Sequence, residues 1–146
     1  MSFPEGYFFI RNVFSGKVLD VKDHSKKEGA NIILWHRKSL LNDNQLWKYE
    51  DGYIINKETG FVLEVQGGIG GGNLKPGSDI VQAKRREPPT SINQLWAYNY
   101  EYLQPFDPKV CLAVHDNKFD DGTKIVVTEL IDFPNNIKQQ WQFDEV

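Results

Sequence analysis

The sequence predicts an all-β fold made of three similar units. A short string ending in Gln-x-Trp recurs along the chain: Asn44-Gln45-Leu46-Trp47, Asn93-Gln94-Leu95-Trp96 and Lys138-Gln139-Gln140-Trp141. The copies lie about 45 residues apart, a period typical of repeat architectures in which neighbouring units bury a shared core. An aromatic residue also follows each tryptophan by two positions. No segment carries the apolar stripe of a long helix, and Gly and Pro interrupt most candidates.

The first unit, residues 7–49, contains four segments that read as strands. Residues 7–10 are apolar, and residues 18–21 alternate in part, as a half-buried strand does. A turn at Ser15-Gly16 separates these two segments, and a polar loop over residues 22–29 leads to the third, residues 31–35. The Gln-x-Trp string begins the fourth.

The second and third units, residues 52–98 and 101–143, repeat this order. Strands are predicted at 53–55, 62–65, 79–81 and 94–96, and then at 102–103, 110–114, 124–127 and 139–141. Two sets of matching residues fix the alignment: Leu19-Asp20-Val21, Leu63-Glu64-Val65 and Leu112-Ala113-Val114, and then Gly29, Gly77 and Gly122. About twelve short strands in three units indicate a closed threefold arrangement, because propellers need at least ~4 blades.

Composition sets limits on the class of protein. At 146 residues the chain is long enough for one domain, residues 1–146, with a substantial core. The net charge of -3 argues against nucleic acid as the main partner. No apolar run approaches the ~20 residues of a membrane span, so we expect no membrane insertion. The first residues show no signal-peptide pattern, so we expect a cytoplasmic protein or one exported without a cleaved signal.

No pattern for a metal ion or a cofactor is found. Cys111 is the only cysteine, so neither an internal disulfide nor a cysteine-based metal site can form. His24, His36 and His115 lie in different segments without ligand spacing. The glycine-rich stretch 67–73 fits neither phosphate-binding motif, and no helix follows it. We therefore expect no cofactor and no metal.

The three in-phase Gln-x-Trp strings resemble those of the ricin-B-type (R-type) lectin family, whose fold is the β-trefoil. The resemblance covers residues 7–143. It implies that Trp47, Trp96 and Trp141 belong to a shared core. The glutamines of the three strings are then expected to be internal hydrogen-bonding partners, because a buried amide must be satisfied.

The resemblance also implies a carbohydrate site that uses an acid at the second strand, an aromatic residue about fifteen positions later, and an Asn before the Gln. Such groups suit a sugar, since the polar ones hydrogen-bond hydroxyls and the aromatic face covers the C–H side of the ring. The first unit has all three. The expected contact residues for galactose or N-acetylgalactosamine are Asp20, Trp35, Asn44 and Gln45, with His36, Lys38 and Asp23 as further candidates.

The other two units keep less of this pattern. In the second, Glu64 and Asn93 remain but Ala83 aligns with the aromatic, and the glycine-rich stretch raises the entropic cost of ordering the first loop. Weak or no binding is expected there. In the third, all three positions have changed, to Ala113, Thr128 and Lys138. A chain with one good site would gain avidity as a homodimer or on dense glycans.

Two other functions stay open beside a lectin without enzymatic activity. The sequence shows no catalytic triad, nucleophile elbow or metal motif. The chain is nevertheless similar in size to small single-chain ricin-like toxins of fungi, so a toxin or defence protein with rRNA N-glycosylase activity is one alternative. A β-trefoil protease inhibitor acting through an exposed loop, residues 85–91, is the other, since fold does not settle function.

Overall fold

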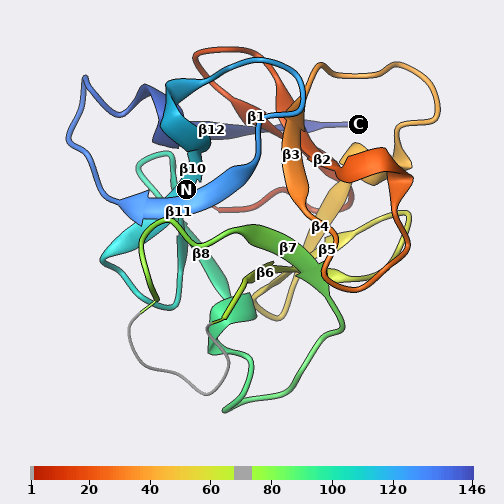
Figure 1. Cartoon of the computed structure of the whole chain (residues 1–146). Helices are drawn as coiled ribbons and strands as arrows, with labels where there is room; N and C mark the ends of the chain where they lie inside the picture. Colours follow the sequence, from red (N-terminus) through yellow and green to blue (C-terminus); the bar gives the residue numbers. More distant parts are fainter. Residues whose placement is uncertain (1, 68–73) are drawn as a thin grey trace.

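The computed structural model describes residues 2–67 and 74–146, so most of the glycine-rich stretch lies outside the described residues. Within these described residues, twelve strands in three groups of four surround a main hydrophobic core, which confirms the all-β fold and the three units (Figure 1). Helical structure in the described part is limited to five short 3-10 segments. None of the described helices has the length and apolar character that a membrane span needs.

Each unit contributes four strands in the predicted order. The first unit has β1 (Phe8–Asn12), β2 (Val18–Val21), β3 (Ile32–Trp35) and β4 (Trp47–Glu50). The second has β5 (Tyr53–Asn56), β6 (Val62–Val65), β7 (Ile80–Ala83) and β8 (Trp96–Asn99). The third has β9 (Tyr102–Pro105), β10 (Val110–Val114), β11 (Ile125–Glu129) and β12 (Trp141–Glu145). The 3-10 segments are η1 (Lys22–His24), η2 (Asp43–Gln45), η3 (Ile92–Gln94), η4 (His115–Asn117) and η5 (Ile137–Gln139).

The strand pairing repeats with the same threefold pattern. The second and third strands of each unit form an antiparallel hairpin: β2 with β3, β6 with β7, and β10 with β11. The remaining strands pair as β1 with β12, β4 with β5, and β8 with β9. The hairpin registers place Trp35 opposite Val18, Ala83 opposite Val62, and Thr128 opposite Cys111. The sequence alignment of the three units, including Ala83 and Thr128 at the aromatic position, is therefore confirmed.

Three glycines join the hairpins in a ring. The backbone N–H of Gly29 donates to the carbonyl of Gln82 at 2.7 Å, that of Gly77 to Val127 at 2.7 Å, and that of Gly122 to Leu34 at 2.8 Å. Each glycine has φ between 90° and 93°, which L side chains rarely adopt. Each unit therefore bonds to the next, and β3, β7 and β11 lie around a common centre (Figure 1).

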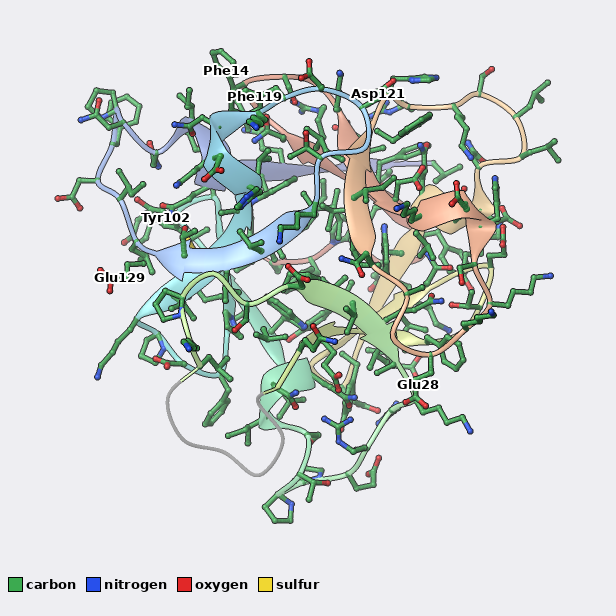
Figure 2. The ribbon with its side chains drawn as sticks, viewed as in Figure 1. Phe14, Glu28, Tyr102, Phe119, Asp121 and Glu129 are labelled. Atoms are coloured by element: carbon green, nitrogen blue, oxygen red, sulfur yellow. The ribbon has the colours of Figure 1, made fainter. Side chains whose placement is uncertain are left out.

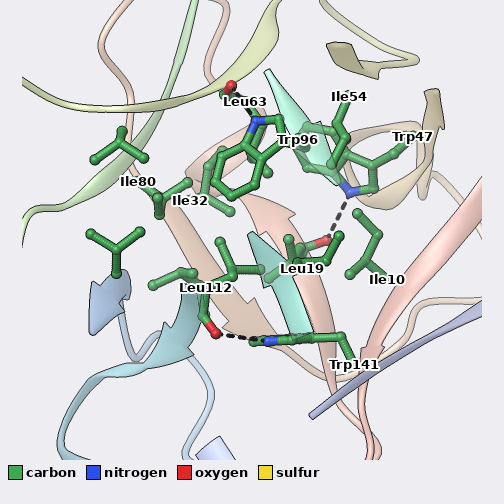
Figure 3. Close-up of a cluster of buried hydrophobic side chains, with 14 of the residues drawn as sticks. Ile10, Leu19, Ile32, Trp47, Ile54, Leu63, Ile80, Trp96, Leu112 and Trp141 are labelled. Atoms are coloured by element: carbon green, nitrogen blue, oxygen red, sulfur yellow. Dashed lines mark hydrogen bonds between the residues drawn. The ribbon is translucent and has the colours of Figure 1, made fainter. Parts of the chain in front are cut away.

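The core is built from the repeated tryptophans. Trp47 and Trp141 are fully buried, and Trp96 is 3% exposed. Each indole N–H donates to the carbonyl of the leucine in the second strand of its own unit: Leu19 at 3.4 Å, Leu63 at 3.0 Å and Leu112 at 3.0 Å (Figure 3). The core role predicted for the three tryptophans is confirmed.

The three glutamines of the repeated strings are buried and fully paired. The side-chain oxygen of each accepts a backbone N–H, and its amide donates to a backbone carbonyl two residues earlier than that N–H. In the first unit these partners are Lys38 N–H and the His36 carbonyl. The glutamine therefore fixes the chain segment that follows the third strand, as a satisfied buried amide should.

The aromatic residue after each tryptophan closes one end of the core. Tyr49 stacks on Phe3 at 3.7 Å between ring centroids, and Phe143 lies 4.9 Å from the same ring. The Tyr49 hydroxyl donates to the carbonyl of Trp96 at 2.8 Å, and the Tyr98 hydroxyl donates to that of Trp141 at 2.6 Å. The two tyrosines thus link the first unit to the second and the second to the third, and Phe143 packs on Phe8 of the first unit with ring centroids 5.0 Å apart.

Candidate functional site

A hollow of about 230 Å³ opens in the first unit, and we call it the first-unit pocket. Five of the predicted site residues line it: Asp20, Asp23, Trp35, Lys38 and Asn44. His24 and Ile33 complete the lining. They come from β2, η1, β3, η2 and the loop before η2. Residues up to 24 positions apart in the chain therefore meet at one point.

Asp20 is the acid at the base of the first-unit pocket. It is only 3% exposed, and Ile33 lies opposite it in the β2–β3 register. Its Oδ1 accepts from Asn44 Nδ2 at 3.2 Å and its Oδ2 accepts from Gln45 Nε2 at 3.0 Å. Burial raises the pKa of Asp20, against the hydrogen bond from Gln45 and the positive charge of Lys38. Each oxygen keeps further acceptor capacity, because a carboxylate offers about four lone-pair sites.

Asn44 and Gln45 hold Asp20 from the short η2 turn. Asn44 is 1% exposed, and its Nδ2 also donates to the Val21 carbonyl at 3.1 Å. Gln45 is fully buried, and its amide divides its protons between Asp20 and a backbone carbonyl. Gln45 can therefore take part in ligand binding only by orienting Asp20, whereas Asn44 lines the first-unit pocket itself.

Lys38 and His24 form a hydrogen-bonded chain across the pocket. Lys38 Nζ lies 2.9 Å from Asn44 Oδ1 and 2.9 Å from His24 Nε2. His24 Nδ1 lies 2.8 Å from Glu58 Oε1, in the turn between β5 and β6. An ammonium has no acceptor, so this arrangement requires a His24 ring that carries its proton on Nδ1. One of the three Lys38 protons stays available for a ligand.

His24 and Ile33 were not predicted from the sequence as pocket residues. His24 lies in the polar loop after the second strand, at a φ of 52° in the left-handed region. Its approach to Lys38 and Glu58 depends on the path of three separate loops. Ile33 could have been found from its place two residues before Trp35, on the same face of a strand.

Trp35 supplies the aromatic wall and rests against the third unit. It ends β3, is partly buried, and lines the first-unit pocket. A Cβ placed on Gly122 would lie 3.9 Å from Cζ3 of the Trp35 ring. The turn of the third unit therefore backs the ring that the first unit presents.

His36 binds an aspartate of the third unit. Its Nδ1 lies 2.8 Å from Asp121 Oδ2, and its backbone N–H donates to Asp121 Oδ1 at 2.9 Å. Burial would raise the pKa of Asp121, but the hydrogen bonds from His36 and Lys17 lower it. The residues that line the first-unit pocket do not include His36, whose ring centroid lies 5.6 Å from that of Trp35. Figure 2 shows Phe14 and Phe119 close together and Asp121 farther along the same edge of the molecule.

In the second unit an arginine occupies the corresponding position. Arg86 Nη1 lies 2.7 Å from Glu64 Oε1, and Arg86 Nη2 donates to Asn93 Oδ1 at 2.8 Å. The backbone of Arg86 binds Gln94 as that of Lys38 binds Gln45, so the two cations are structural counterparts. Both retained polar residues are therefore already paired, and Ala83 offers no aromatic face.

The third unit lacks an acid at this position. Ala113 is fully buried, and Thr128 Oγ1 accepts from Gln139 Nε2 at 2.7 Å. The threonine hydroxyl thus satisfies the glutamine amide that Asp20 satisfies in the first unit. Among the described residues no group of His, Cys, Asp and Glu is arranged to hold a metal ion.

The 85–91 loop of the inhibitor alternative is held against the body of the protein. Arg86 points inward to Glu64, and the Arg85 guanidinium lies 4.1 Å from the centre of the Tyr53 ring. Ser91 at the end of the loop is fully buried. Both basic side chains of the loop are thus engaged within the protein.

Comparison with known proteins identifies the family. The profile of the ricin-type β-trefoil lectin domain-like family matches residues 2–83, more than half of the chain. The chain belongs to this family. Mucoricin of Rhizopus delemar is 50% identical over 60 residues, which is 40% of this chain and 41% of mucoricin. The match therefore spans less than half the length of that relative.

Solved structures show the same fold over the whole chain. The mdaA-1 domain superposes with a TM-score of 0.85 and 26% identity, covering 99% of this chain and 92% of that domain. The C-terminal half of an earthworm R-type lectin, solved in complex with GalNAc, superposes with a TM-score of 0.77 and 20% identity. That comparison covers 97% of this chain and 98% of the lectin half. The β-trefoil fold is confirmed, and the family match is to a lectin-type domain.

Proposed function

We propose that the protein binds a terminal galactose or N-acetylgalactosamine ring in the first-unit pocket. The observation that carries the proposal is the meeting of Asp20, Asn44 and Trp35 around one hollow. A buried carboxylate with free lone pairs, a fixed amide and an aromatic face are the groups that a sugar ring requires. The GalNAc bound by the earthworm lectin of the same fold supports this ligand class.

Each residue has a distinct role in this proposal. Asp20 accepts hydrogen bonds from the hydroxyls that distinguish galactose, and Gln45 and Asn44 keep its carboxylate oriented. Lys38 donates its remaining proton to a sugar oxygen. Trp35 covers the C–H face of the ring, an arrangement that combines apolar burial with contacts to the ring electrons.

The proposed site predicts weak binding by one pocket. A volume of about 230 Å³ lies below the ~300–1,000 Å³ of drug-sized pockets, which suits one ring. We expect a Kd on the order of mM to tens of µM, about 4–6 kcal/mol. Higher avidity then requires a homodimer or densely displayed glycans, since linked sites raise the effective concentration.

Calorimetric titration with galactose, N-acetylgalactosamine and glucose tests the proposal. Asp20→Ala should abolish binding of the first two sugars, because the buried acceptor is lost. Asp116→Ala, which removes an exposed acid from the matching turn of the third unit, should leave sugar binding unchanged. Circular dichroism checks that both variants fold. Unchanged binding by a folded Asp20→Ala variant would place the sugar elsewhere.

The toxin or defence role is a second candidate, favoured by the partial match to mucoricin. Cell entry through surface glycans would then use the first-unit pocket. A depurination assay on ribosomes with the purified protein, run beside Asp20→Ala, separates the two activities. Depurination that persists in Asp20→Ala would indicate a catalytic site apart from the sugar pocket, and no depurination by either protein would remove the enzymatic alternative.

A further inference from the structure

A second hollow adjoins the first-unit pocket, and we call it the lysine groove. It has a volume of about 580 Å³ and is formed by the loop over residues 22–31. Lys22, Lys26 and Lys27 line it, and Asp23 lines both the lysine groove and the first-unit pocket. A molecule in the pocket that extended past Asp23 would therefore reach the three lysines.

The lysines of the groove carry charge that the protein does not neutralise. All three are exposed, and within residues 2–67 and 74–146 none of them has a carboxylate at salt-bridge distance. Glu28, labelled at the edge of the molecule in Figure 2, accepts the backbone N–H of Lys84 at 3.0 Å instead. Asp23 is the one acid among the lining residues. The lysine groove is thus a positive region on a chain whose net charge is -3.

The loop that presents these lysines is fixed by a buried glutamine of the second unit. Gln82 is fully buried, and its Nε2 donates to the carbonyls of Ser25 and Lys27 at 2.9 Å each. Its backbone accepts from Gly29 N–H at 2.7 Å and donates to the Ala30 carbonyl at 3.0 Å. The backbone of the loop is therefore ordered before any ligand arrives, which lowers the entropic cost of binding.

We propose that the lysine groove binds an anionic group, a sulfate ester or a carboxylate, on the saccharide unit next to the ring held in the first-unit pocket. The ligand class is then an acidic glycan with a galactose-type terminus. Lysine acts as a point charge with rotatable donors, so it accepts either anion. Exposed charges are screened by salt, so the contribution must fall as ionic strength rises. This inference rests on the proposed sugar site.

Three small saccharides test the inference on the whole protein. Lactobionate and lactitol both join galactose to an open-chain residue, but only lactobionate carries a carboxylate. Lactose with a sulfate ester on its glucose ring provides the sulfate arm. At about 20 mM salt, we expect lactobionate to bind about fivefold to tenfold more tightly than lactitol, and at about 300 mM salt the preference should largely disappear.

Charge-removing variants locate the effect. Lys22→Gln, Lys26→Gln and Lys27→Gln combined should abolish the preference for lactobionate and leave lactitol binding unchanged. Lys118→Gln, which removes an exposed lysine beside η4 of the third unit, should keep the preference. If the triple variant folds poorly, the single Lys26→Gln variant replaces it and is expected to lose part of the preference for lactobionate.

The outcomes separate the two proposals. Equal binding of lactobionate, sulfated lactose and lactitol would overturn the lysine groove and leave the sugar site intact. A preference that survives the triple variant would also overturn it. Binding of lactobionate without any binding of lactitol or lactose, lost in the triple variant but kept in Asp20→Ala, would overturn the sugar site and show an anion site alone.

Discussion

The first and second units build the same polar framework, but the acid is paired with a cation in the second unit and not in the first. In both, the glutamine of the repeated string binds the backbone around a cation that follows the third strand. Arg86 lies 2.7 Å from Glu64 and donates to Asn93 at 2.8 Å, so it pairs with both polar residues that a ligand of the second unit would need. Lys38 binds Asn44 and His24 but forms no salt bridge with Asp20 within the described residues. The first unit therefore keeps an acid that a ligand can use.

This difference shows that retaining an acid and an asparagine is not enough to keep a site. The longer Glu64 and the forked guanidinium match each other, and the planar fork can contact two acceptors at once. In the first unit a lysine lies beside the shorter Asp20, which leaves room for a ligand. Trp35 borders that space, at the position that Ala83 has in the second unit. The cation, the length of the acid and the residue at the aromatic position together distinguish the open first unit from the internally paired second unit.

The largest expected effect comes from removing the arginine. Arg86→Leu leaves Glu64, 7% exposed, as a buried carboxylate without its cation. Breaking such a pair costs about 3–5 kcal/mol when both partners are buried; because Arg86 is partly exposed, we expect about 2–3 kcal/mol of lost unfolding free energy. Urea unfolding followed by tryptophan fluorescence measures it.

Lys38→Leu is the matched control in the first unit. The loss there should be smaller, about 1 kcal/mol, because Lys38 gives up hydrogen bonds to Asn44 and His24 rather than an ion pair with a buried acid. The double variant Glu64→Gln with Arg86→Leu should recover most of the stability, because the uncompensated charge is gone. Equal losses in the two units would mean that the Arg86 pair is not what distinguishes them.

The sequence predicted the part of this comparison that depends on period and register. The three units and the hairpin alignment follow from residues at fixed spacing. The core role of the tryptophans and the grouping of Asp20, Trp35 and Asn44 were expected from the family resemblance. The inward turn of Arg86 could not be predicted, because its sequence neighbours Lys84 and Arg85 look equally exposed. His24 and Glu58 meet 34 positions apart through two turns, and such contacts have no local sequence pattern.

The second effect in size concerns the aromatic wall. Trp35→Ala gives the first unit the residue that the second unit has at this position. We expect galactose binding to weaken by about tenfold to a hundredfold, or about 1.4–2.8 kcal/mol, because ring burial and the contact with the aromatic face are lost. Isothermal titration gives the change, with Tyr100→Ala as an exposed aromatic control. An unchanged Kd would exclude stacking on Trp35.

The third effect is a loss of binding in acid. The pKa of an ordinary aspartate is about 3.9. Burial raises the pKa of Asp20 above this value, so its carboxylate takes up a proton at a higher pH. Protonation removes acceptor capacity, so galactose affinity should fall severalfold as the pH is lowered from 7 toward the raised pKa. Stability should change in the opposite sense: the folded state binds this proton more tightly, so the cost of burying the charged form is present above the folded pKa and disappears below the unfolded one.

Galactose titrations at several pH values test this, with Asp20→Asn as the control, because its amide takes up no proton in this range. A loss of binding in acid that is absent from Asp20→Asn belongs to the Asp20 carboxylate. An equal loss in Asp20→Asn would contradict this assignment.

The smallest effect tests whether Lys38 helps the ligand or blocks it. Lys38 Nζ already donates to Asn44 Oδ1 and His24 Nε2, each at 2.9 Å, and has one proton left. If that proton binds a sugar oxygen, Lys38→Met should weaken galactose binding by about threefold to tenfold, the value of one hydrogen bond, about 0.5–1.5 kcal/mol. Tighter binding would instead mean that Lys38 competes with the sugar for Asn44, as Arg86 already does for Asn93 in the second unit. The sign of this change in affinity therefore decides whether Lys38 helps to bind the sugar or, like Arg86 in the second unit, competes with it for the asparagine.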